Sequence, residues 1–207
     1  MQGKEFLYLA EWRREVAALY AQVRKTRHPE HAWHVFRKTR DKLFSEHPQS
    51  PLEPRQKSGF AALNYFHYDE NFRIIGTIVE SKPVSHLIDL PAEGVLNLTR
   101  FAKVKFDICQ QSLSLSLYWV GGYGGGIFLP FRDKSNAHQT YGGGRYLYDG
   151  IKGADLGAGK EYILLDFNFA YNPSCAYNER WVCPLAPPEN WLDVSIEAGE
   201  KDFVSST

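Results

Sequence analysis

The chain has 207 residues, long enough to bury a sizeable core, and its 24 basic residues balance 24 acidic ones, so the formal net charge is zero. A neutral chain lacks the basic footprint that nucleic-acid binding normally leaves, and we expect no nucleic-acid partner. No apolar run approaches the ~20 residues of a membrane-spanning helix, so no membrane is expected either, and the N-terminus does not read as a signal peptide. The three cysteines, an odd number, favour a reducing compartment and hence a cytoplasmic location over a disulfide scaffold.

Residues 1–46 predict a helical hairpin. Apolar residues recur at steps of three and four between residues 4 and 26, the spacing of one helix face. Pro29 interrupts this pattern and suits the first turn of a second helix, which continues to about Glu46. Basic residues crowd the first 42 positions. We interpret them as a solvated helical face, with a nucleic-acid or lipid contact as the alternative.

A Pro-rich linker at 47–59 precedes a region of 60–207 in which the apolar period changes to two. Alternation is clearest at 96–108 and 112–119, as in half-buried antiparallel strands. Further strands are expected at 60–68, 72–80, 84–90, 126–131, 145–148 and 162–169, the first two forming a hairpin. The fold class is therefore mainly β (α+β): an antiparallel β-barrel or curved sandwich of about eight strands, which forms one compact unit with the helical hairpin.

The C-terminal third carries the polar residues that most resemble a site. Within the strand predicted at 162–169, Asp166 and Asn168 share the face opposite to four apolar residues, and Tyr171 and Asn172 follow directly. If this face lines a barrel interior, the two side chains project into it together. The alternative is structural: Asp166 pairs with Arg145 or Arg132, and the asparagines cap the Pro-rich loop.

The glycine triplet 142–144 precedes Arg145, so backbone N–H groups and a guanidinium could face an anion together. It does not fit the G-x-G-x-x-G pattern of a dinucleotide-binding loop. The alternative interpretation is a hairpin turn with close backbone approach.

Cys175 and Cys183 flank a short loop. They are interpreted as buried thiols or a redox-dependent pair, with a metal site or a nucleophile as alternatives. Zinc would need two more ligands, and Cys109 and His138 lack the spacing, so no metal and no cofactor is expected. A nucleophilic cysteine would need a base such as His138 or His67, supplied by tertiary contact.

The C-terminal part of the chain resembles a bacterial and archaeal family known as domain of unknown function 1684. The resemblance is carried, in this order, by segments 131–133, 140–147, 165–173, 175–177, 183–185, 188–190 and 198–201. The similarity is concentrated after residue 130. The resemblance implies a family and a region of interest but no reaction.

These observations favour binding of a small polar or anionic molecule in the mouth of the barrel. The expected ligand-binding residues are Arg132, Tyr141, Arg145, Asp166, Asn168, Tyr171, Asn172 and Tyr177. One alternative is a cofactor-free hydrolase or isomerase in the same cleft, with Asp166 as general base or Cys175 or Cys183 as nucleophile. Another is an interaction module that uses the basic helical hairpin. The protein is expected to be a monomer, or a homodimer through Trp12, Trp33 and Phe36.

Overall fold

The computed structural model describes residues 3–90 and 94–204. Its first two elements are the helices α1 (Gly3–Lys25) and α2 (Pro29–Glu46), as the apolar periodicity predicted. Pro29 occupies the first turn of α2, where its missing N–H costs nothing. The two helices pack through their apolar faces, with the rings of Tyr20 and Phe36 5.6 Å apart. In the described part of the chain, neither these helices nor the short α3 is long and apolar enough to cross a membrane.

The strand predicted at 60–68 does not form, and so neither does its hairpin. After α3 (Pro54–Ser58), the chain is extended but makes only one isolated bridge, between Tyr65 and Glu200. Its apolar side chains pack inward instead, Leu63 being 1% exposed. The alternation of apolar residues was real, but it reflects burial beneath the helices and the C-terminal segment, because no sheet edge lies beside this stretch.

One antiparallel sheet of six strands, in the order β5-β4-β3-β2-β1-β6, dominates the described residues. The strands are β1 (Arg73–Leu90), β2 (Gly94–Ile108), β3 (Gln111–Val120), β4 (Gly126–Phe131), β5 (Arg145–Asp149) and β6 (Tyr162–Asp166). The stretches predicted at 72–80 and 84–90 are parts of the single strand β1. Its pairing with β2 shifts register between Glu80 and Val84, which accommodates Pro83 at an irregularity.

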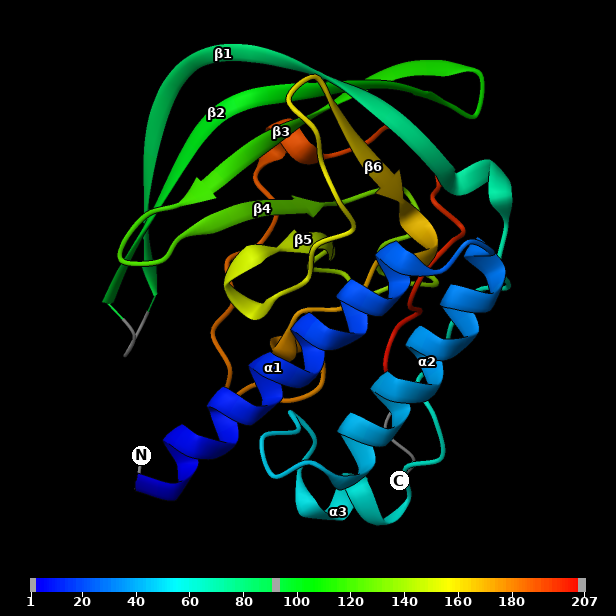
Figure 1. Ribbon diagram of the computed structural model, residues 1–207, viewed down its shortest axis with the longest axis vertical. Helices are drawn as coiled ribbons and strands as arrows, with labels where there is room; N and C mark the ends of the chain where they lie inside the picture. The colour runs from blue at the N-terminus through cyan, green and yellow to red at the C-terminus, as the bar shows by residue number, and fades with distance from the viewer. Residues whose placement is uncertain (1–2, 91–93, 205–207) are drawn as a thin grey trace.

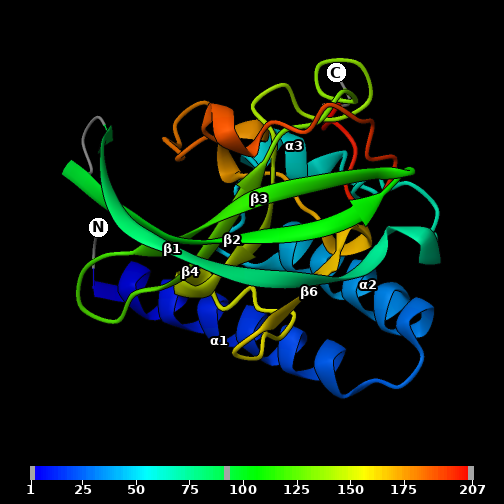
Figure 2. The ribbon, with the colours of Figure 1, turned by 90° about the horizontal axis from the view of Figure 1, so that it is seen from above.

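The sheet is a curled half-barrel, so the curved antiparallel architecture is confirmed with six strands in place of about eight. In Figure 1 the long strands β1, β2 and β3 arch over the molecule, and α1 and α2 lie beneath the arch. Figure 2 shows the same arch from above, with the helices along one side. The barrel stays open because β5 and β6 end the sheet without pairing to each other.

The C-terminal segment fills the space under the sheet with short turns and irregular chain. It contains the 3-10 turns η3 (Phe167–Phe169), η4 (Ser174–Ala176) and η5 (Pro188–Asn190), while η1 (Glu70–Phe72) and η2 (Gly150–Lys152) occur earlier. The predicted strand 162–169 therefore ends at Asp166 and turns into η3. Phe169 in that turn packs against Phe36 of α2, with ring centroids 5.0 Å apart, so helices and C-terminal segment share one core.

Candidate functional site

The residues predicted to form one site occupy separate places in the structure. Asp166 and Asn168 lie at the end of β6. Arg145, Tyr171, Asn172 and Tyr177 are buried in the interior beneath the helices. Tyr141, Cys175 and Cys183 meet at a partly exposed group of loops, described below. Arg132 lies apart from these groups, its guanidinium carbon 4.6 Å from the centre of the Trp191 ring.

Arg145 is buried inside the protein, and both of its terminal nitrogens are hydrogen bonded there. Its side chain is 0% exposed, and Nη2 lies 2.9 Å from Asp133 Oδ2. The same guanidinium donates to the carbonyl oxygens of Ile196, Ala198 and Glu200. The anticipated pairing of Arg145 or Arg132 with Asp166 is therefore wrong, since the carboxylate that Arg145 pairs with is Asp133. A guanidinium held in this way organises the C-terminal segment and has little capacity left for a ligand.

Tyr177 and Asn172 belong to a second buried network centred on Glu200. Arg40 Nη2 from α2 lies 2.8 Å from Glu200 Oε2, the Tyr177 hydroxyl donates to Oε1, and the backbone N–H of Asn172 donates to Oε2 over 3.2 Å. Tyr171 and Asn172 border a cavity of only about 50 Å³. Such a space is far below the several hundred Å³ of a typical organic-ligand pocket. This network therefore ties α2 to the end of the chain.

Asp166 is held at the edge of the sheet by its own local structure. Its Oδ1 accepts hydrogen bonds from the backbone N and side-chain Nδ2 of Asn168, at 3.2 and 2.9 Å. Asn168 in turn binds the backbone N and O of Asp69. The side chain of Asn168 therefore serves to position the carboxyl of Asp166. The other carboxyl oxygen, Oδ2, faces Arg73, whose Nε is 3.5 Å away.

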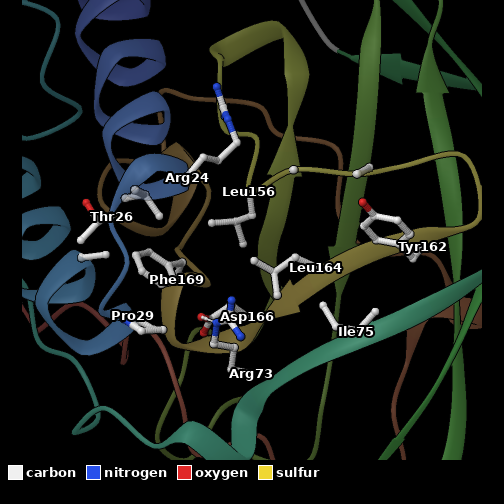
Figure 3. Close-up of a pocket in the computed structure, with 14 residues that line it drawn as sticks. Arg24, Thr26, Pro29, Arg73, Ile75, Leu156, Tyr162, Leu164, Asp166 and Phe169 are labelled. Atoms are coloured by element: carbon white, nitrogen blue, oxygen red, sulfur yellow. Dashed lines mark ion pairs between the residues drawn. The ribbon is translucent and has the colours of Figure 1, made fainter.

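A pocket of about 390 Å³ opens beside this pair, between the α1–α2 junction and the β1–β6 edge. Figure 3 shows Arg73 reaching from β1 to Asp166, while Arg24 enters from α1 with its guanidinium directed away from Asp166. The head of Arg24 is instead bound to the carbonyl oxygen of Asp155. The walls are mainly apolar, formed by Val23, Ile75, Leu156, Leu164 and Phe169 among others.

Burial changes the chemistry of the Asp166 carboxyl. The side chain is 1% exposed, and loss of hydration raises its pKa from 3.8 to about 6, against the opposing effects of Asn168 and Arg73. Burial, followed by the charge of the nearby Asp166, raises the pKa of the Tyr68 phenol to about 12. A carboxyl in this range can accept or release a proton near neutral pH.

Sequence reasoning identified Asp166 but missed Arg73 and Arg24. No local signal marks these arginines, because Arg73 meets Asp166 only through the pairing of β1 with β6. Arg24 was counted as part of a solvated basic face. The sequence pattern singled out Asp166, but the arginine beside it in the structure is Arg73 and not Arg145 or Arg132.

The predicted cysteine pair does come together. Cys175 and Cys183 are partly buried free thiols that share a hydrogen bond, and the Tyr141 hydroxyl donates to Cys175 Sγ over 3.6 Å. Among the residues that the structure describes, no three histidine, cysteine, aspartate or glutamate side chains gather as a metal ion would require.

Comparison with known proteins places the chain in a family. A family model described as "Protein of unknown function (DUF1684)" matches residues 58–201. The chain belongs to the DUF1684 family. The matched region contains Arg73, Asp166, both clustered cysteines and the buried partners Asp133 and Arg145, whereas α1 and α2 precede it.

A solved structure is similar to this DUF1684 chain over most of its length. An uncharacterized protein of Haloarcula marismortui, determined by solution NMR, is 35% identical in sequence and superposes with a TM-score of 0.61. The similarity covers 83% of this chain and 93% of the archaeal one. The search of curated proteins finds no match.

Proposed function

We propose that this DUF1684 protein binds a small organic acid in the pocket at the β1–β6 edge. The observation that carries the proposal is the pairing of a buried, protonatable carboxyl, Asp166, with Arg73 in a cavity of about 390 Å³. Cavities of this size commonly hold small molecules, and convergent polar groups within apolar walls give them orientation. An adjoining cavity of about 440 Å³ is also lined by an arginine–aspartate pair, Arg24 with Asp155, but that carboxylate is half exposed.

The charge distribution favours an anionic ligand. Of the described residues lining the pocket, Asp166 is the only acidic one, and its raised pKa leaves part of the population neutral near pH 6. Arg73 uses Nε toward Asp166, and its terminal nitrogens are suited to a carboxylate or sulfonate. Asp166 Oδ2 would accept a hydrogen bond from a hydroxyl or amino group on the same ligand.

The apolar walls would hold the carbon skeleton. Ile75, Leu164 and Phe169 enclose the polar pair, and Tyr162, 56% exposed, stands at the rim. A ligand with a charged head and a short hydrocarbon body fits this division. The proposal keeps the expected small polar or anionic ligand and moves it from the barrel mouth to the sheet edge.

Benzenesulfonate and its neutral analogue benzenesulfonamide test the proposal as matched probes in saturation-transfer NMR. We expect the sulfonate to bind and the sulfonamide to bind weakly. Arg73→Gln should weaken sulfonate binding at least about tenfold, because the variant loses a charge-assisted hydrogen bond to the sulfonate. Arg13→Gln, at an exposed position of α1, is the control for loss of one positive charge. Equal binding of the two probes, or equal effects of the two substitutions, contradicts the proposal.

A second candidate function is cofactor-free proton transfer with Asp166 as general base. The observation that favours it is the pKa of about 6, which suits a base working near neutrality. Exchange of the methyl protons of pyruvate in D2O, followed by NMR, tests this function. Asp166→Asn should abolish any exchange above the buffer rate while retaining sulfonate binding. Exchange that survives the substitution excludes Asp166 as the base.

The homodimer contact expected through Trp33 and Phe36 is not available, because these side chains are 3% and 0% exposed and belong to the core. The interaction-module alternative keeps another surface, since Phe6, Leu7 and Tyr8 of α1 are exposed. We propose a monomer, which light scattering tests, in a reducing, cytoplasmic compartment of a bacterial or archaeal cell.

A further inference from the structure

The cluster formed by Cys175, Cys183 and Tyr141 lies outside the organic-acid pocket and is used by no function described so far. Cys175 lies in η4 and Cys183 in the irregular chain that follows it. Both thiols are partly exposed and hydrogen bonded to each other. Neither cysteine lies in an α-helix or a β-strand, so no long element has to move for the two sulfurs to approach each other.

The glycine triplet places Tyr141 against this pair. A Cβ on Gly143 would lie 2.5 Å from Cε1 of Tyr141 and 3.1 Å from Leu185, so glycine is needed where the phenol packs. The Tyr146 hydroxyl donates to the carbonyl of Pro184 over 2.5 Å and fixes the residue next to Cys183. The feature first interpreted as an anion loop or a hairpin turn thus serves to position a hydrogen-bond donor.

The two thiols differ strongly in acidity. The hydrogen bond from Cys183 lowers the pKa of Cys175 from 9.0 to about 6, with further help from Tyr141 and from the charge of Lys152, against the effect of burial. The bond to Cys175 and burial raise the pKa of Cys183. Burial and the sulfur of Cys175 raise the pKa of Tyr141, so its hydroxyl remains a donor. Cys175 is therefore the sulfur that ionises first, while Cys183 keeps its proton.

We propose that Cys175 and Cys183 form a two-electron oxidation site whose substrate is a hydroperoxide. The Cys175 thiolate attacks the terminal oxygen of ROOH, the O–O bond breaks, and Cys175 becomes a sulfenic acid while RO⁻ takes a proton from solvent to leave as ROH. The Cys183 thiol then attacks the Cys175 sulfur, which forms the disulfide and releases water. The two cysteines together lose two electrons to the peroxide, and an external dithiol would reduce the disulfide back to two thiols.

The contacts of Cys175 favour this chemistry over acyl transfer. Its interacting groups in the described residues are hydrogen-bond donors and a cation, namely Cys183, its own backbone N–H, Tyr141 and Lys152. The acid–base partner that acyl transfer requires is not among them. A thiol beside the thiolate instead supplies the resolving group for a sulfenic acid.

Peptide mass spectrometry after treatment with one equivalent of hydrogen peroxide tests the proposal. We expect the wild-type chain to lose two hydrogens and yield a Cys175–Cys183 crosslink. Cys183→Ser should trap a dimedone adduct on Cys175, whereas Cys175→Ser, the same change at the other sulfur, should yield neither product. Cys109→Ser, at an exposed turn, is the matched control and should behave as wild type. Oxidation that begins at Cys109 or Cys183, or a chain that remains fully reduced, overturns the proposal.

Alkylation by iodoacetamide as a function of pH tests the role of the neighbouring donors. At pH 6, Cys175 should react at least about tenfold faster than Cys109 in the same molecule. Tyr141→Phe and Cys183→Ala, which each remove a hydrogen-bond donor, should move the midpoint of the Cys175 profile upward. For each unit by which the pKa of Cys175 rises, its alkylation rate at pH 6 should fall roughly threefold. The fall is less than tenfold because a thiolate of higher pKa is more nucleophilic, which partly offsets the smaller thiolate fraction. An unmoved midpoint contradicts the inferred activation. Sulfonate binding should be unaffected in both variants, which separates this site from the organic-acid pocket.

Discussion

Arg145 and Asp133 form an ion pair from which solvent is excluded: the two atoms lie 2.9 Å apart, and both side chains are 0% exposed. Asp133 Oδ1 also accepts hydrogen bonds from the backbone N of Ser135 and Ile196. Because Arg145 starts β5 and also binds carbonyls of the last turns, this pair connects the sheet edge to the C-terminal segment.

Removing one member of this pair should be strongly destabilising. Asp133→Asn leaves a buried guanidinium without its carboxylate and should lower the free energy of unfolding by about 3–5 kcal/mol, as measured by urea denaturation. Lys134→Ala, which breaks the exposed pair of Lys134 with Asp193, should cost at most about 1 kcal/mol. Similar losses in the two variants would mean that the buried pair is not a structural anchor.

Asp166 should make the protein less stable as pH rises. Its pKa is raised in the folded state, from 3.8 to about 6, so its ionisation between about pH 4 and pH 6 penalises the folded protein. Asp166→Asn removes this penalty, and its unfolding free energy relative to wild type should improve by about 2 kcal/mol from pH 4 to pH 7. Asp193→Asn, at an exposed carboxylate, controls for loss of a charge. A difference independent of pH would show that the Asp166 carboxyl is not perturbed.

Gly144 should tolerate substitution less well than Gly122, although both have positive φ angles, of 91° and 114°. A Cβ on Gly144 would lie 2.5 Å from the carbonyl oxygen of Phe131, whereas on Gly122 it would meet nothing within 4 Å. Gly122→Ala should cost about 1–2 kcal/mol from backbone strain, and Gly144→Ala about 1–3 kcal/mol more from the clash. Thermal unfolding of the two variants compares them, and equal losses would contradict the close approach.

The helical hairpin and the sheet should unfold together. Phe36 is 0% exposed and packs on Phe169 of η3, and Arg40 of the same helix pairs with Glu200. Phe36→Ala should lower the unfolding free energy by about 3–5 kcal/mol. Far-ultraviolet circular dichroism and aromatic near-ultraviolet signals should follow a single transition with the same midpoint. Two separated transitions would show that residues 1–46 form an independent unit.

The sequence predicted those features that arise from local periodicity. Both helices and the strands β2 and β3 follow from apolar spacing, because a helix face or a wet-faced strand repeats within a few residues. The same reasoning failed for 60–68, since alternation reports burial on one side and does not reveal whether a neighbouring strand is present. A strand requires a partner, and the partners at this point are a helix and the C-terminal segment.

The candidate sites show the same division. Asp166 stood out as a polar residue in an apolar strand, but its partner Arg73 depends on β1 lying next to β6. Arg145 looked like a ligand group because Asp133, its actual partner, is joined to it only by the β4–β5 pairing and the turns between. Tertiary contacts determine which charged side chains pair with each other, and the spacing of residues along the sequence does not predict those contacts.

The most direct test of the organic-acid pocket is to follow backbone amide resonances of the ¹⁵N-labelled protein by NMR during a titration with benzenesulfonate. We expect the amides of the pocket-lining residues Ile75, Gly157, Ala158 and Phe169 to shift together with one dissociation constant, and Arg73→Gln to remove these shifts. Shifts that map elsewhere, or that persist unchanged in Arg73→Gln, would contradict it.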